Sequence, residues 1–145
     1  MMNQRYIVVA DQTRARVYLY DRKNKQLNEQ YDLFCPEGRQ QAKDIYTDRP
    51  GRNRADVGGE RHALARDNLT RDHETAVFAR EIGSRLEADR NRNKIDELTV
   101  IAPPHFLGEL RKHLSPECGK LVVRTIDKNL SKSRDEEIVR HLLAE

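Results

Sequence analysis

The stretch RPGRNRADVGGERHALAR, residues 49–66, carries the side chains that most clearly suggest a specific chemistry. It holds five arginines and no lysine against two acidic residues, and it includes a Gly-Gly pair. Arginine binds phosphate through a planar fork of N–H donors, and glycine lets backbone N–H groups approach a ligand closely. We therefore expect phosphate or RNA contacts here. The candidate RNA-binding residues are Arg49, Arg52, Arg54, Arg61 and Arg66.

A solvated loop without a partner is the alternative interpretation of the same residues. Residues 36–70 show no apolar repeat of period 2 or 3.6, so we expect one long Arg- and Gly-rich loop inside the domain. A loop of this length in a compact domain is uncommon, and it is either functional or disordered. Composition alone leaves both interpretations open.

Metal and nucleophile chemistry has much weaker support in the sequence. Asp11 and Asp127 follow two expected strands, but the strand between them ends in Ala-Pro-Pro, where a two-metal nuclease would need another carboxylate. Both aspartates are explained as turn or helix-approach residues. The five histidines show no zinc spacing, and neither a Gly-rich phosphate loop nor a G-x-S-x-G motif occurs. We expect no metal and no cofactor.

The elements that must position these residues begin with three strands. Residues 6–10 are apolar throughout, as in a strand covered on both faces, and residues 15–20 and 27–34 follow after short turns. In the second strand Val17 and Leu19 lie opposite Arg16, Tyr18 and Tyr20. The third strand should bear three residues on one face: Leu27, Tyr31 and Leu33.

Helices and strands alternate after the loop. A helix is expected over residues 72–92, a strand over 98–102, a helix opened by Pro103-Pro104, and a strand over 121–126. Ser133 and Glu136 form a capping box for a last helix. Its expected apolar face is Ile138, Val139, Leu142 and Leu143. The order predicts an α/β mixed sheet of five strands, ordered 3-2-1-4-5 and ribonuclease H-like, with helices on its faces.

Length and composition fit one domain over residues 1–145. Hydrophobic residues make up 37% and charged residues 35% of the chain, and the net charge of +3 is too small to identify a partner by itself. No apolar run is long enough to span a membrane, and the first residues resemble no export signal. Two cysteines, Cys35 and Cys118, fit a reducing compartment and are expected to be unpaired. We expect a cytoplasmic protein.

Several blocks together resemble the bacterial host attachment protein family, in order and over nearly the whole chain. The most specific block is APPHFLGELRKHLSP, residues 102–116. The others are VVADQTRARVY (8–18), PEGR (36–39), DRPGR (48–52), GGERHAL (58–64), FARE (78–81) and DKNLS (127–131). The resemblance implies a role in attachment to host cells, which is a phenotype and not a chemistry.

The family in turn resembles the middle domain of archaeal and eukaryotic peptide-release factors. In that domain a Gly-Gly-Gln tip lies on a long loop between the third strand and a long helix. The resemblance implies that Gly58 and Gly59 shape such a tip here and that Glu60 stands in place of the glutamine. A glutamate is anionic and opposes the charge of a developing oxyanion, so hydrolysis of peptidyl-tRNA is not expected.

Two functions from different classes follow. One is a cytoplasmic binding module that docks on the ribosome or tRNA through the arginine-rich segment. The other is an attachment-related protein that acts at the cell surface or indirectly, without binding RNA. The missing export signal favours the first, and co-sedimentation with ribosomes separates the two.

Overall fold

The computed structural model describes the backbone of residues 3–36 and 57–144, and the side chains of residues 3–36 and 70–144. Its strands are β1 (Arg5–Ala10), β2 (Arg14–Asp21), β3 (Gln26–Phe34), β4 (Glu97–Ala102) and β5 (Val122–Asp127). Its helices are α2 (Val57–Asn91), α3 (Pro104–His113), α4 (Pro116–Leu121) and α5 (Asp135–Leu143).

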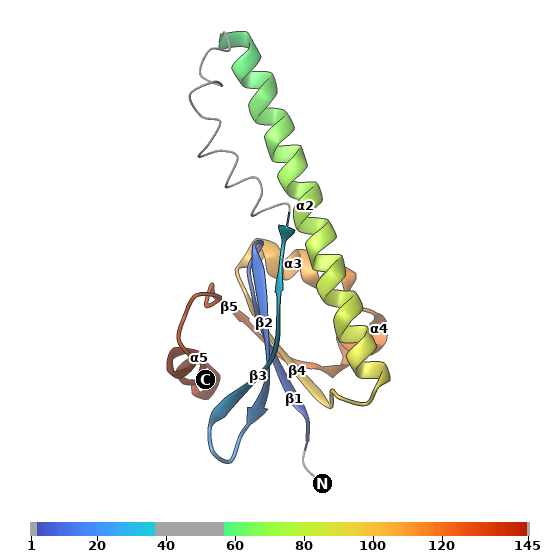
Figure 1. The fold of residues 1–145 in the computed structure, drawn as a ribbon, viewed down its shortest axis with the longest axis vertical. Helices are drawn as coiled ribbons and strands as arrows, with labels where there is room; N and C mark the ends of the chain where they lie inside the picture. The colour runs from blue at the N-terminus through green and yellow to red at the C-terminus, as the bar shows by residue number, and fades with distance from the viewer. Residues whose placement is uncertain (1–2, 37–56, 145) are drawn as a thin grey trace.

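The five strands form one mixed sheet in the order β3-β2-β1-β4-β5, which confirms the predicted order (Figure 1). Strand β1 lies at the centre, antiparallel to β2 and parallel to β4, and β4 is parallel to β5. Residues 6–10 are all buried, as their continuous apolar sequence predicts for a strand covered on both faces.

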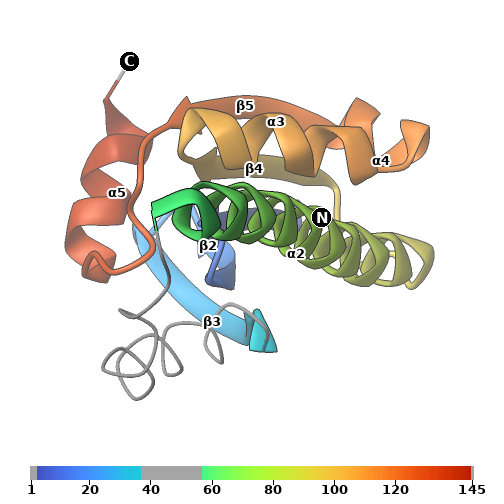
Figure 2. The same ribbon diagram turned by 90° about the horizontal axis from the view of Figure 1, so that it is seen from above.

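Helices cover both faces of the sheet. Figures 1 and 2 show α2, α3 and α4 on one side, here called the α2 face, and α5 on the other, here called the α5 face. Side chains alternate between the faces, so Tyr6 and Val8 join the core under α2, whereas Ile7 and Val9 join a smaller cluster under α5.

A β-bulge corrects one predicted strand face. Val17 pairs with Tyr31 but Tyr18 pairs with Glu29, so Gln30 has no partner in β2. One extra residue reverses the alternation. Leu27 therefore packs in the cluster under α5, whereas Tyr31 and Leu33 pack on the α2 face.

The helix ends confirm one predicted signal and correct another. Pro103 and Pro104 open α3 as expected, and Ser115 caps a short helix, α4, which the sequence did not predict. The predicted capping box at Ser133 and Glu136 is wrong: α5 begins at Asp135, Arg134 occupies the cap position, and no described side chain caps the helix. The Ser133 carbonyl instead accepts a hydrogen bond from Arg16, 2.8 Å away.

Candidate functional site

Helix α2 carries the Gly-Gly-Glu sequence away from the sheet. It has 35 residues, which at 1.5 Å per residue makes it about 50 Å long. Figure 1 shows its amino-terminal part extending well beyond the end of the sheet. Gly58, Gly59 and Glu60 lie in its first turn, at the end farthest from the packed part of the helix.

This placement corrects the predicted start of the helix, which was Asp72. The Gly-Gly pair and the missing apolar repeat favoured a loop, but the residues after Gly59 include Glu60, Arg61, Ala63 and Leu64, which are strong helix formers. The part of a helix that extends beyond the body of a protein needs no apolar face, so an apolar repeat in the sequence does not reveal it. The Gly-Gly-Glu sequence is therefore at a helix start rather than in a loop.

The structure locates only part of the predicted arginine set. Arg61 and Arg66 lie on the extending part of α2, where the backbone alone is described. Arg49, Arg52 and Arg54 lie outside the described residues.

The carboxyl-terminal half of α2 is fixed against the sheet through the predicted apolar face. These buried residues are Thr75, Phe78, Ala79, Ile82 and Leu86. Gly83 brings α2 very close to α3, because a Cβ atom at this position would lie 2.3 Å from the carbonyl oxygen of His113. Only glycine permits this approach.

A buried carboxylate also ties α2 to the sheet. Asp89 is 2% exposed, and its Oδ2 accepts a hydrogen bond of 2.6 Å from the hydroxyl of Tyr31 on β3. The pKa of Tyr6 on β1 is raised to about 12. The largest cause is burial, followed by the negative charge of Asp89 and a hydrogen bond to it. Arg85 lies over the Tyr31 ring, 3.9 Å from its centroid. One acidic group thus joins α2 to two strands.

A second carboxylate joins α2 to α4. Glu87 Oε1 accepts hydrogen bonds from Arg90 Nε at 2.7 Å and from Ser115 Oγ at 2.9 Å. These bonds lower the pKa of Glu87 to about 2. The thiol of Cys118 also points to Glu87, and burial raises its pKa, so this cysteine is a poor nucleophile. Among the described residues, Cys35 and Cys118 are both buried and neither forms a disulfide, as expected.

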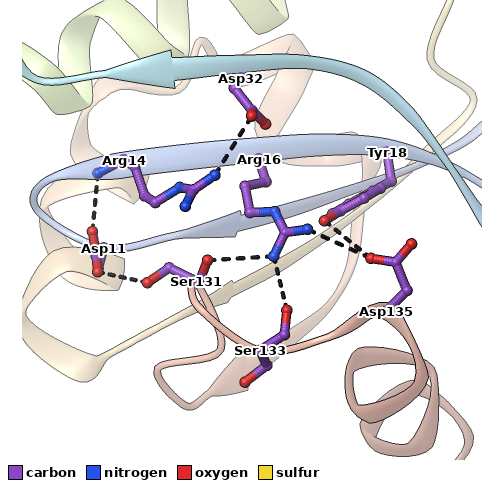
Figure 3. Close-up of polar contacts among 8 residues, drawn as sticks. All are labelled: Asp11, Arg14, Arg16, Tyr18, Asp32, Ser131, Ser133 and Asp135. Carbon is purple, nitrogen blue, oxygen red and sulfur yellow. Dashed lines mark hydrogen bonds and ion pairs between the residues drawn. The ribbon is translucent and has the colours of Figure 1, made fainter.

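At the end of the sheet from which α2 extends, a polar cluster joins β1 and β2 to the segment before α5 (Figure 3). Asp11 Oδ1 accepts hydrogen bonds from the backbone N–H groups of Thr13 and Arg14, and Oδ2 accepts one of 2.6 Å from buried Ser131. Burial would raise the pKa of Asp11, but the bonds from Ser131 and Thr13 lower it overall. Asp11 is therefore an ionised structural group.

Two arginines of β2 complete this cluster. Arg16 donates to the carbonyl oxygens of Ser131 and Ser133 and contacts Asp135 at 3.5 Å, and Arg14 contacts Asp32 at 3.5 Å (Figure 3). The sequence alternation had placed Arg16 with Tyr18 and Tyr20 on one face, but did not indicate that this face is covered. The two tyrosines that share this face with Arg16 are the sequence signal that could have indicated that the face is covered.

The described residues contain no group of three His, Cys, Asp or Glu side chains arranged to hold a metal ion. His105 and His113 lie on α3, where His113 approaches Glu109 at 3.8 Å. His73 is exposed on α2.

Within the part of the chain that the structure describes, no helix has the length and apolar character needed to cross a membrane. Comparison with curated proteins finds no match to the chain. A family model described as "Protein required for attachment to host cells" matches residues 6–142, from β1 to the last turn of α5. The chain belongs to this host attachment family.

Proposed function

We propose that the protein is a cytoplasmic RNA-binding module that docks on the ribosome or tRNA through the amino-terminal part of α2. One observation carries the proposal: α2 is fixed to the sheet by its carboxyl-terminal half and holds Gly58, Gly59 and Glu60 beyond the sheet at its other end (Figure 1). A rigid support of this kind suits a contact made inside a larger RNA assembly.

The chemistry of this end of α2 favours phosphate. The first N–H groups of a helix have no partner within the helix, and they carry the positive end of its dipole. Gly58 and Gly59 add no side chains that would keep a phosphate away. The surrounding sequence, residues 49–66, adds five arginines against two acidic residues.

We propose binding without efficient hydrolysis. The release-factor resemblance assigns Glu60 the place of a catalytic glutamine, but a glutamate is negatively charged at neutral pH. Its charge opposes both the RNA phosphates and the oxyanion that forms as an ester is cleaved. In this proposal the attachment phenotype of the family arises indirectly, through altered translation.

The experiment is co-sedimentation with ribosomes at two salt concentrations, together with fluorescence anisotropy of labelled tRNA. We compare the parent with Arg52→Ala/Arg54→Ala/Arg61→Ala. Each lost phosphate contact should lower the slope of log affinity against log salt by about 0.7–0.9. The matched control is Arg80→Ala/Arg92→Ala/Arg111→Ala, which removes the same charge from exposed positions on the body of the domain.

We expect the first triple variant to lose most of its RNA affinity and the control to keep it. Equal loss in both variants would indicate non-specific attraction to a cationic protein. No RNA or ribosome binding by the parent would contradict the proposal and favour a surface or indirect role in attachment without RNA.

Hydrolysis is tested separately by release of peptide from charged ribosomes. The parent should be inactive or weak, and Glu60→Gln, which removes the charge at nearly constant shape, should gain at most about 10²–10³-fold, the size of one well-placed polar group. Robust release by the parent that Glu60→Gln abolishes would instead make Glu60 a general base.

A further inference from the structure

A cavity of about 520 Å³ opens on the α5 face, at the end of the sheet where β1 begins. It exists because α5 has only nine residues and leaves this part of the face uncovered. Ile7 and Thr99, which pair in register and are both buried, line it, and Leu142 of α5 contributes to its wall. Val123 and Leu143 also line it and are 61% and 52% exposed. Apolar surface is thus open to a ligand.

Three cations and one acid line the same cavity. Arg5 pairs with Glu97 at 3.1 Å, and Arg124 donates to the carbonyl oxygen of Leu142 at 2.7 Å. Arg22 is exposed and makes no hydrogen bond or ion pair with any residue that the structure describes. The cavity is therefore net positive, and one guanidinium is free to bind.

Tyr20 also lines this cavity, and its hydroxyl group is unsatisfied. Its oxygen is buried and has no hydrogen-bond partner among the described residues. Tyr6 pairs with Leu19, so Arg5 and Tyr20 lie side by side on the α5 face. Both residues, with Arg22, also line an adjoining cavity of about 370 Å³. A buried hydroxyl without a partner is costly, and an oxyanion would satisfy it.

We propose that this cavity binds a small organic anion with an apolar chain or ring. Its carboxylate, sulfonate or phosphate oxygens contact Arg22 and the hydroxyl of Tyr20, and its apolar part covers Ile7 and Val123. A volume of this size is typical of small-molecule sites. The residues that line the cavity include the start of β1 and of β4. Figure 1 shows these strand starts at the end of the sheet opposite the projecting part of α2, so this site does not depend on RNA binding.

The first experiment measures binding of 8-anilinonaphthalene-1-sulfonate by fluorescence, with decanoate as competitor and decanol as its neutral counterpart. We expect saturable binding of the probe, displacement by decanoate, and weak or no displacement by decanol. Titration of decanoate into isotopically labelled protein should shift the backbone amide signals of Arg22, Thr99 and Val123.

Three substitutions test the contacts proposed between the cavity and the anion. Arg22→Gln should weaken decanoate binding about tenfold, the usual size for one charge-assisted hydrogen bond. Tyr20→Phe should also weaken it, while the melting temperature of the free protein stays the same or rises, because the hydroxyl has no partner to lose. Val123→Glu, at an exposed position, should weaken binding by repulsion without unfolding the protein. Arg111→Gln on α3 is the control with the same charge change.

Several outcomes would overturn the proposal. These are no saturable probe binding, displacement by decanol as strong as by decanoate, amide shifts confined to other surfaces, and equal affinity in Arg22→Gln and Arg111→Gln. The variant Arg52→Ala/Arg54→Ala/Arg61→Ala should bind decanoate like the parent, so a failure here and a failure of RNA binding are distinguishable.

Discussion

The two faces of the sheet differ in how completely their buried polar groups are satisfied. On the α2 face, Asp89 and Glu87 each accept hydrogen bonds from more than one direction and join helices to strands. On the α5 face, four buried side-chain atoms of the described residues have no partner. They are Arg14 Nε, Arg16 Nε, Tyr20 Oη and Asp32 Oδ1.

Strand register assigns all four atoms to one face. Arg14, Arg16 and Tyr20 alternate with Val17 and the rest of the α2-facing core, and Asp32 pairs directly with Arg16. Because an unsatisfied buried group lowers stability, the α2 face must supply more of the free energy of folding. It also holds the helix that presents the candidate RNA contacts. Of the four unsatisfied groups on the α5 face, the hydroxyl of Tyr20 belongs to a residue that lines the proposed anion site.

The largest predicted effect is at Gly83 on the α2 face. Gly83→Ala places a methyl group against the backbone of His113, so α2 and α3 must move apart. We expect a loss of about 3 kcal/mol in the free energy of unfolding, the upper end for overpacking, measured by urea denaturation. The higher helix propensity of alanine offsets at most about 1 kcal/mol.

Gly108 of α3 provides the control, since a Cβ atom there would meet no atom of the described residues within 4 Å. Gly108→Ala should stabilise the protein by up to about 1 kcal/mol through helix propensity alone. Equal effects at the two glycines would mean that the close approach of α2 to α3 does not exist in solution.

An intermediate effect compares the same substitution on the two faces. Tyr31→Phe removes the 2.6 Å hydrogen bond to buried Asp89 and should cost about 1–3 kcal/mol of unfolding free energy. Tyr20→Phe, on the α5 face, removes a hydroxyl without a partner and should change stability by less than about 0.5 kcal/mol. A large loss for Tyr20→Phe would show that the α5 face is as fully satisfied as the α2 face.

Much of this comparison could be anticipated from sequence, because strand and helix periodicity report burial. The continuous apolar run of β1 indicated a central strand, and the spacing of Phe78, Ile82 and Leu86 indicated the buried face of α2. Proline at the start of α3 marked its first turn. The sheet order followed from these elements and from the right-handed crossover rule.

The candidate sites were harder, because their residues come together only through long-range packing. The partners of Asp11 and Arg16 lie more than a hundred positions away along the chain, at Ser131 and Asp135. Leu143 fits the apolar repeat of α5 but is half exposed, since the short helix does not cover the sheet there. A single extra residue at Gln30 also changed which face Leu27 joins. The apolar repeat of the sequence does not show which distant residues pair, how far α5 covers the sheet, or where a bulge occurs.

Asp11 is the exception on its side of the sheet, because its carboxylate is fully engaged. Asp11→Asn should keep most of these contacts: the amide oxygen accepts from Thr13 and Arg14, and the amide nitrogen donates to the hydroxyl of Ser131. The change therefore removes mainly the negative charge. At pH 7 we expect a loss of about 1 kcal/mol, the difference between charged and neutral hydrogen bonds.

The pH dependence of unfolding tests the role of the Asp11 charge most directly. The pKa of Asp11 is lower in the folded chain than in the unfolded chain, where the pKa of aspartate is about 3.9. As pH falls, the unfolded chain takes up the proton first, so the stability that the carboxylate contributes above this value is lost as pH falls through the folded-state pKa. The parent and Asp11→Asn should therefore differ at pH 7 in urea denaturation, and the difference should shrink as pH falls below about 3.9. Asp127→Asn, at the exposed end of β5, is the matched control and should follow the parent at every pH. A constant difference between the parent and Asp11→Asn across this range would mean that the variant loses packing rather than charge, and that the cluster at Asp11 is no better satisfied than the rest of the α5 face.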